Sequence, residues 1–151
     1  MNDMTSITSI KRARLAAMNF LARREHSKSE LIEKLTKKDI DLNIAEEAIN
    51  KLALEDLQSD FRFAECIIRN SLKKGQGPIA IKTRLQQKHI AEHIIEDLLC
   101  NLDVDWQQQA RNTYHKKFKQ TKERDKKEFA KGVRFLQYKG FSLEIIMAVV
   151  N

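Results

Sequence analysis

One short motif in the sequence has the residue types and spacing of a metal site. His89-Ile90-Ala91-Glu92-His93 has the H-x-x-E-H form that inverted metalloproteases use to bind zinc. That chemistry requires both imidazoles on one helical face, with the carboxylate beside a metal-bound water. An internal repeat, described below, places His89 in a turn and His93 at the start of the next helix. We therefore expect no metal and no other cofactor, and zinc in the purified protein would contradict this.

Other groups that could support catalysis are incomplete. Gly75-Gln76-Gly77 is followed by proline, follows no strand and lacks a Lys-Ser or Lys-Thr pair, so it does not form a phosphate-binding loop. His26 and His115 have no nearby triad partner, which indicates surface or cap residues. The adjacent carboxylates Glu46 and Glu47 point to different sides of a helix. We predict that the protein is not an enzyme.

The composition favours a soluble helical protein with an anionic partner. The 151 residues include 28 Lys and Arg against 21 Asp and Glu, for a net charge of +7. The sequence has no long apolar run and no signal-type segment, so we expect a cytoplasmic protein that does not bind membranes. Cys66 and Cys100 lie on apolar stripes and are expected to be core thiols. One Pro, four Gly and few β-branched alternations indicate an all-α fold.

An internal repeat organises the chain. Residues 27–52 recur as residues 77–102, and a fainter third copy follows at a shift of one more residue. Leu35 and Ile40, for example, match Leu85 and Ile90, then Leu136 and Phe141. A repeat of this length is typical of stacked units that share their cores. We predict three tandem three-helix repeats, over residues 10–57, 58–102 and 103–151, after a flexible arm over residues 1–9.

Capping residues set the predicted helix starts. Ser27 to Glu30 has the capping-box form, and Asp41, Asp105 and Ser142 can cap further helices. Gly75 and Gly140 follow helix ends. In the third repeat, the helical spacing of Trp106, Ala110, Tyr114 and Phe118 predicts a core face. The chain must turn within the charged span 116–127.

Basic residues recur at equivalent positions of the repeats. A single one is expected to be a solvated surface charge with little effect on stability. As a recurring set, however, they are candidate contacts for an anionic partner. The set comprises Arg23, Arg24, Lys28, Lys73, Lys74, Lys82, Arg84 and Lys88.

Three-helix units also resemble helix-turn-helix modules, whose second helix enters the major groove. The second helices begin Lys28-Ser29-Glu30 and Pro78-Ile79-Ala80, which are poor base-reading sequences. Phosphate contact without sequence choice is more plausible. A stand-alone helix-turn-helix regulator that binds duplex DNA remains the alternative function.

Three blocks resemble the RecX family. They are Leu21-Ala22-Arg23-Arg24-Glu25-His26-Ser27, Asp60-Phe61-Arg62-Phe63-Ala64-Glu65 and Lys74-Gly75-Gln76-Gly77-Pro78. The resemblance covers about residues 12–151 and implies an elongated, curved array of three three-helix repeats. His89 departs from the family pattern, which has Gly there, so we expect that turn to be less free to become left-handed.

The resemblance also implies the function. It implies a bacterial regulator that binds the RecA filament on single-stranded DNA and inhibits the ATPase, strand-exchange and coprotease activities of RecA. We expect the RecA filament to be the partner, single-stranded DNA to be bound weakly or through the filament, and the protein to be a monomer. Blocked filament growth and promoted disassembly both fit this expectation.

Overall fold

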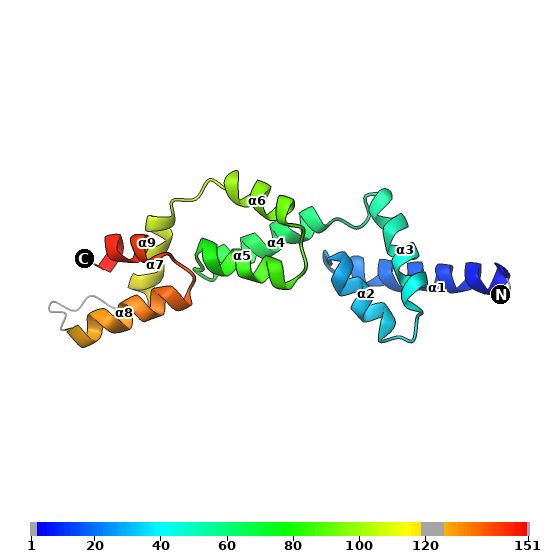
Figure 1. The fold of residues 1–151 in the computed structure, drawn as a ribbon, viewed down its shortest axis with the longest axis horizontal. Helices are drawn as coiled ribbons and strands as arrows, with labels where there is room; N and C mark the ends of the chain where they lie inside the picture. The colour runs from blue at the N-terminus through cyan, green and yellow to red at the C-terminus, as the bar shows by residue number, and fades with distance from the viewer. Residues whose placement is uncertain (1–2, 119–125, 151) are drawn as a thin grey trace. The chain divides into compact units, whose positions relative to one another are not determined.

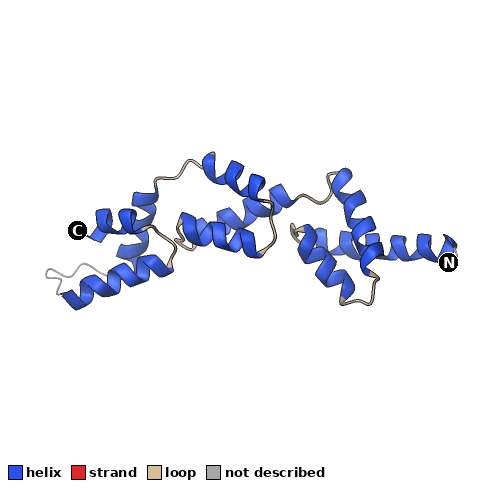
Figure 2. Cartoon of the chain, in the orientation of Figure 1, coloured by secondary structure: helices blue, strands red, loops and turns tan. Residues whose placement is uncertain are grey.

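The computed structural model describes residues 3–118 and 126–150, and within these ranges the chain forms nine α-helices and no strand (Figures 1 and 2). The helices are α1 (Asp3–Leu21), α2 (Lys28–Thr36), α3 (Leu42–Leu54), α4 (Asp60–Lys73), α5 (Pro78–Gln87), α6 (Glu92–Cys100), α7 (Trp106–Lys117), α8 (Lys126–Tyr138) and α9 (Leu143–Val150). The predicted all-α class and the three groups of three helices are confirmed. None of the described helices is long and apolar enough to cross a membrane.

The chain divides into two compact units. Unit 1 comprises residues 1–66 and 88–90, and unit 2 comprises residues 67–87 and 91–151. The division falls within α4, between Cys66 and Ile67. Hydrogen bonds explain why the start of α4 belongs to unit 1: Asp60 accepts from the Lys28 amide at 2.9 Å, and Arg62 Nε donates to Glu25 at 3.0 Å.

The core of unit 1 is built from one face of each of its first three helices. Ala13 and Ala17 of α1 are fully buried against apolar residues of α2 and α3, which include Leu31, Leu35 and Ile49. The predicted capping box starts α2, because Ser27 Oγ accepts from the Glu30 amide while Glu30 accepts from the Ser27 amide. Since caps satisfy amides that have no partner within the helix, they fix where each helix begins.

The expectation about the N-terminal arm needs correction. Helix α1 begins at Asp3, so residues 3–9 are helical, whereas we expected an arm over residues 1–9. Within α1, Leu15 and Met18 are exposed, and the small residues Ala13 and Ala17 are buried instead. Small side chains allow α1 to approach α3 closely, while Ile10, Phe20 and Leu21 pack against the same core and are partly buried.

Positions related by the repeat occupy equivalent environments. Leu35, Leu85 and Leu136 are each fully buried. The turn between the second and third helices of each group contains a left-handed residue, at Asp39 (φ 63°), His89 (φ 59°) and Gly140 (φ 95°). The turn therefore adopts the left-handed conformation with histidine at position 89, which carries a steric cost that glycine would not have.

Within unit 2, the start of α5 is joined to the turn between α8 and α9 by backbone hydrogen bonds. The Gly77 amide donates to the Lys139 carbonyl at 2.8 Å, and the Ile79 amide donates to the Gly140 carbonyl at 3.0 Å. A Cβ atom on Gly77 would lie 2.5 Å from the Gly140 oxygen, so only glycine fits. The Gly-x-Gly-Pro block thus includes a residue required for close backbone approach.

Helices α7, α8 and α9 pack on one another around a second core. Ala110 and Tyr114 are buried there with Trp106 and Phe118 at the edge, so the predicted aromatic core face is confirmed.

Cys66 is half-buried, but Cys100 is exposed, which contradicts its expected place in a core. Within the charged span 116–127, residues 119–125 lie outside the described residues.

Candidate functional site

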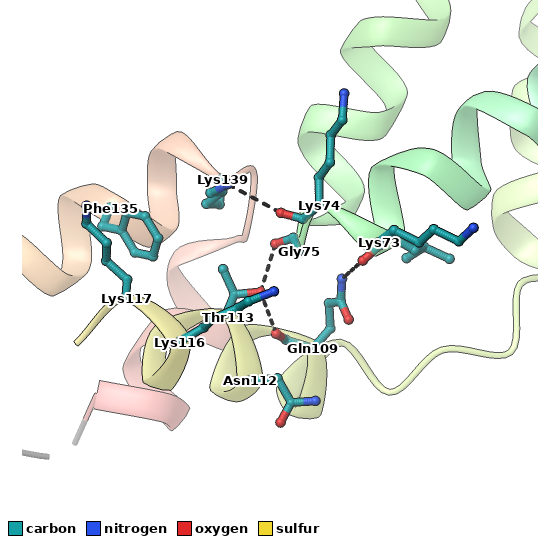
Figure 3. A pocket seen from close by; sticks show the side chains of 11 residues that line it. Lys73, Lys74, Gly75, Gln109, Asn112, Thr113, Lys116, Lys117, Phe135 and Lys139 are labelled. Atoms are coloured by element: carbon teal, nitrogen blue, oxygen red, sulfur yellow. Dashed lines mark hydrogen bonds between the residues drawn. The ribbon is translucent and has the colours of Figure 1, made fainter. Parts of the chain in front are cut away.

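A lysine-rich cavity lies in unit 2, where the C-terminal end of α4 meets α7 and α8 (Figure 3). Its volume is about 400 Å³. The lining combines five lysines with amide, hydroxyl and aromatic groups, and contains no Asp or Glu among the described residues. It comprises Leu72, Lys73, Lys74, Gly75, Gln109, Asn112, Thr113, Lys116, Lys117, Phe135 and Lys139.

Two side chains one turn apart on α7 hold the end of α4 in place. Gln109 Nε2 donates to the Leu72 carbonyl at 2.8 Å, and Thr113 Oγ1 donates to the Gly75 carbonyl at 2.9 Å. The Leu72 carbonyl lies in the last turn of α4 and the Gly75 carbonyl lies just beyond it, where carbonyls lack the amide partners of a helix interior. The cavity wall is therefore fixed by contacts between residues that are far apart in the sequence.

The positive charge of the five lysines that line the cavity exceeds the partial negative charge of the helix ends that border it. The C-termini of α4 and α7 both border it, and each carries about half a negative charge, so together they offset about one of the five lysines. Lys139 Nζ also donates to the Lys74 carbonyl at 3.3 Å. Among the described residues, no ion pair involves Lys73, Lys74, Lys116 or Lys117. A net positive charge therefore remains for an external anion.

The lysines surround the cavity rather than converge on one point. Figure 3 shows Lys73 and Lys74 extending away from Thr113, with Lys117 beside Phe135 on the other side. A compact anion can contact only a few of these amines at once. A chain of linked anionic groups can contact several of them in succession, so the arrangement suits a polyanion.

Two of the eight predicted basic residues, Lys73 and Lys74, line this cavity. Other predicted residues of α5 have partners in unit 2: Lys82 lies 3.6 Å from Glu92, and Arg84 donates to Ser71 Oγ at 3.5 Å. Lys88 is half-buried and does not line the cavity. The structure therefore brings together only part of the predicted set.

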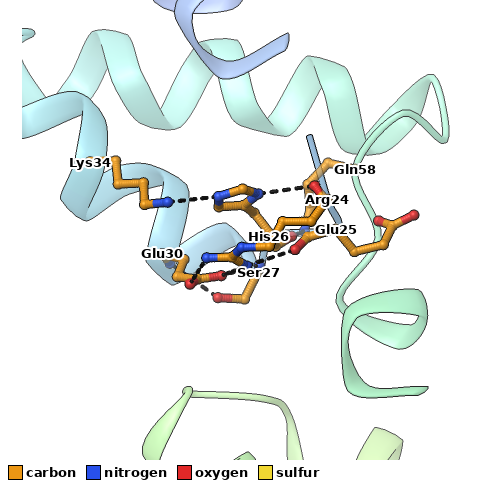
Figure 4. A network of polar contacts seen from close by, with 7 residues as sticks. All are labelled: Arg24, Glu25, His26, Ser27, Glu30, Lys34 and Gln58. Atoms are coloured by element: carbon orange, nitrogen blue, oxygen red, sulfur yellow. Dashed lines mark hydrogen bonds and ion pairs between the residues drawn. The ribbon is translucent and has the colours of Figure 1, made fainter. Parts of the chain in front are cut away.

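In unit 1, Arg24 belongs to an internal polar network (Figure 4). Its guanidinium donates two hydrogen bonds to Glu30, at 2.8 and 3.1 Å. Burial would raise the pKa of Glu30, but the hydrogen bonds and positive charge of Arg24 outweigh burial and lower that pKa. The Glu30 hydrogen bond likewise raises the pKa of Arg24. Arg24 thus supports the start of α2, while Arg23 is exposed and borders a different hollow.

His26 forms the centre of the same network and is only 2% exposed, so the expectation of a surface residue is wrong. Its Nδ1 lies 3.1 Å from the Arg24 carbonyl, and its Nε2 lies 2.8 Å from Lys34 Nζ. A carbonyl only accepts and an ammonium only donates, so His26 is the neutral Nδ1–H tautomer. Burial is the main cause of its lowered pKa.

Lys28, the remaining predicted residue, has its Nζ 3.5 Å from Asn50 Oδ1.

Lys116, Lys117 and Lys139 were not among the candidate residues predicted from the sequence. Lys116 and Lys117 begin the charged span, and Lys139 occupies the position of Lys38 and Lys88 in the repeat. The charged span and the repeat are the two sequence features that could have added these lysines to the candidate residues. Their proximity to Lys73 and Lys74 could not have been found this way, because it depends on the packing of α7 and α8 against the end of α4.

The H-x-x-E-H motif does not have the geometry of a zinc site. His89 lies in the turn before α6, and His93 lies in its first turn, so the imidazoles do not share a helical face. Across residues 3–118 and 126–150, no group of three His, Cys, Asp or Glu side chains could hold a metal ion.

These features define a class of protein: an all-α tandem array of three-helix units, with a lysine-rich cavity in unit 2. Three family descriptions match the chain in order: "RecX, first three-helix domain" over residues 13–52, "RecX, second three-helix domain" over residues 59–99 and "RecX, third three-helix domain" over residues 103–150. The chain belongs to the RecX family.

Individual relatives agree with this assignment. "Regulatory protein RecX" of Acinetobacter baylyi is 40% identical over 99% of this chain and 94% of its own length. The protein of the same name from Vibrio campbellii is 40% identical over 87% of this chain and 84% of its own length. The crystal structure of RecX from Lactobacillus salivarius has a TM-score of 0.80 and 28% identity, covering 95% of this chain and 96% of that one. The relatives are named as regulatory proteins, which is compatible with a role without catalysis.

Proposed function

We propose that this protein regulates RecA by binding the RecA filament on single-stranded DNA. The RecX domains that cover most of the chain support a regulatory role, and the family resemblance supplies RecA as the partner. Binding inhibits the ATPase, strand-exchange and coprotease activities of RecA, and the protein itself performs no chemistry.

The lysine cavity of unit 2 is the single observation that most directly supports contact with the nucleic acid. Phosphates of a single strand carry one negative charge per nucleotide, and the strand is flexible enough to follow amines that point in different directions. Lysine carries its charge on a compact ammonium group and lacks the planar guanidinium with which arginine makes paired hydrogen bonds. Its contacts with phosphates are therefore independent of base sequence. Such contacts suit a regulator that acts on filaments regardless of the DNA sequence on which they form.

The cations contribute through the release of counterions from the phosphates. Each lysine that replaces a condensed cation adds affinity, and this contribution falls as salt concentration rises. The protein can thus remain weakly attached to free DNA, yet be held on the filament when a second contact to protein is added. Two weak contacts on one molecule bind much more tightly than either alone.

The test measures inhibition of RecA ATP hydrolysis on single-stranded DNA. We expect the wild-type protein to inhibit hydrolysis and the double variant Lys116→Glu/Lys117→Glu to inhibit at least tenfold less effectively. These side chains are exposed, so circular dichroism should show unchanged helix content. Arg24→Glu is a poor probe, because it would also break the Arg24–Glu30 pair.

A matched control reverses the charge of Lys37 and Lys51, which are exposed and lie outside the cavity. Inhibition by this control should remain close to that of wild type. Wild-type protein without effect on RecA would contradict the proposed function. Sequence-selective binding to duplex DNA without RecA would support the stand-alone regulator instead.

A further inference from the structure

Helix α1 leaves large apolar side chains in solvent. Its fully buried residues are Ala13 and Ala17, while Leu15 is 64% exposed and Met18 is 40% exposed. Leu15 lies two residues from each buried alanine, and two residues correspond to about 200° around a helix, so it faces away from the core. Single exposed leucines are common, but this one borders a hollow.

The hollow lies beside α1 and has a volume of about 360 Å³. Its apolar part is formed by Leu15, Ala16 and Phe20, and its charged border by Arg12, Arg23 and Lys38. We call these residues, together with Asn19, the α1 groove.

Internal contacts hold the border of the α1 groove in place. Arg12 donates to the Lys38 carbonyl at 3.3 Å, and Lys38 Nζ lies 5.4 Å from the centre of the Phe20 ring. Lys34 Nζ lies 4.9 Å from the same ring. Arg12 and Lys38 are therefore held next to apolar surface, and no carboxylate from the described residues lines the α1 groove.

We propose that the α1 groove binds an acidic segment of the protein partner that inserts an aliphatic or aromatic side chain beside Leu15. Charge complementarity selects the acidic segment: three cations border the groove, and Arg23 makes no ion pair with a described residue. The apolar part supplies a place for an anchor residue, which is how protein interfaces concentrate their binding energy.

The composition of the groove distinguishes a protein occupant from nucleic acid. Phosphates need cations but not aliphatic side chains, and bases stack on aromatic faces rather than on leucine or alanine. The Phe20 ring already has Lys34 and Lys38 over it. The unit 2 cavity has more cations, with five lysines beside Leu72 and Phe135. The two units thus present different chemistry, one for protein and one for phosphates.

This inference rests on the proposed function, in which the partner is RecA. The experiment compares binding to RecA–single-stranded DNA filaments with binding to the same DNA alone, measured by fluorescence anisotropy of the labelled protein. The main variant is Leu15→Asn, which removes the apolar contact without changing charge. The control is Leu54→Asn, since Leu54 of α3 is 88% exposed and lies outside the groove.

We expect Leu15→Asn to weaken filament binding by roughly 10- to 100-fold, the factor associated with burial of one leucine side chain. Its affinity for DNA alone should change by less than about twofold, and Leu54→Asn should match wild type in both measurements. Arg23→Gln should weaken filament binding and reduce its salt dependence, while Lys51→Gln should not.

The possible failures are distinguishable. If wild type binds the filament and Leu15→Asn binds equally well, the inference is wrong and the proposed function stands. An equal loss for DNA alone would make the α1 groove a nucleic-acid surface and would also overturn the inference. If wild-type protein does not bind the filament at all, both proposals fail.

Discussion

The sharpest consequence of the lysine cavity is a change in the salt dependence of DNA binding. If each of its five lysines neutralises one phosphate, the logarithm of the association constant for single-stranded DNA falls with the logarithm of salt concentration with a slope of about −3.5. Neutralising two of them, in Lys116→Gln/Lys117→Gln, should reduce that slope to about −2.1.

The same relation gives the loss of affinity at each salt concentration. At about 0.15 M monovalent salt, two lost contacts correspond to a roughly tenfold weaker complex, and at about 0.05 M to a roughly sixtyfold weaker one. The tenfold loss corresponds to about 1.4 kcal/mol of binding free energy. The difference between the variant and wild type should therefore disappear as the salt concentration approaches about 1 M.

The assay is a titration of labelled oligothymidine at several salt concentrations. The control variant Lys37→Gln/Lys51→Gln has the same net charge but leaves the cavity unchanged. Its slope should equal that of wild type. A slope for Lys116→Gln/Lys117→Gln that equals the wild-type slope would show that these two lysines do not contact phosphates. An equal reduction of the slope in the control would show that net charge rather than the cavity determines binding.

Two further predictions concern stability. His89→Gly should raise the free energy of unfolding in urea by about 1 kcal/mol. Glycine adopts the left-handed conformation at φ 59° without the steric cost that histidine has there. A destabilised variant would show that the turn is not strained. Stability should also fall as pH decreases from about 6.5, because the buried neutral His26 has a lowered pKa and the unfolded chain binds a proton that the folded protein excludes. Above about pH 6.5 both states are neutral and this contribution is fully present. His26→Gln should flatten the profile in that range, and an unchanged profile would exclude His26 as its origin.

Much of the fold follows from patterns that are local in the sequence. The capping box at Ser27 fixes the start of α2, and Asp41 caps α3 through a bond to the Asn43 amide. The repeat correctly matched Leu35, Leu85 and Leu136 as buried positions. Such features depend on residues within a few positions of each other, so the sequence encodes them directly.

The candidate site was only partly predictable. Lys73 and Lys74 were found through their equivalence to Arg23 and Arg24, but that equivalence does not extend to their contacts. Arg24 has an internal carboxylate partner, whereas Lys73 and Lys74 line a cavity. A repeat conserves backbone positions and buried faces, while the partners of each surface charge depend on whichever other helix packs beside it.

The sequence by itself therefore determined the helical class, the groups of three helices and the positions of most helix boundaries, because caps and apolar periodicity act over short distances along the chain. Tertiary structure alone decided which lysines share a cavity and that Leu15 faces solvent instead of the core. The contact of Gln109 with Leu72 spans 37 positions, and that of Lys139 with Lys74 spans 65. Contacts over such separations arise only when the helices pack, so no local pattern in the sequence specifies them.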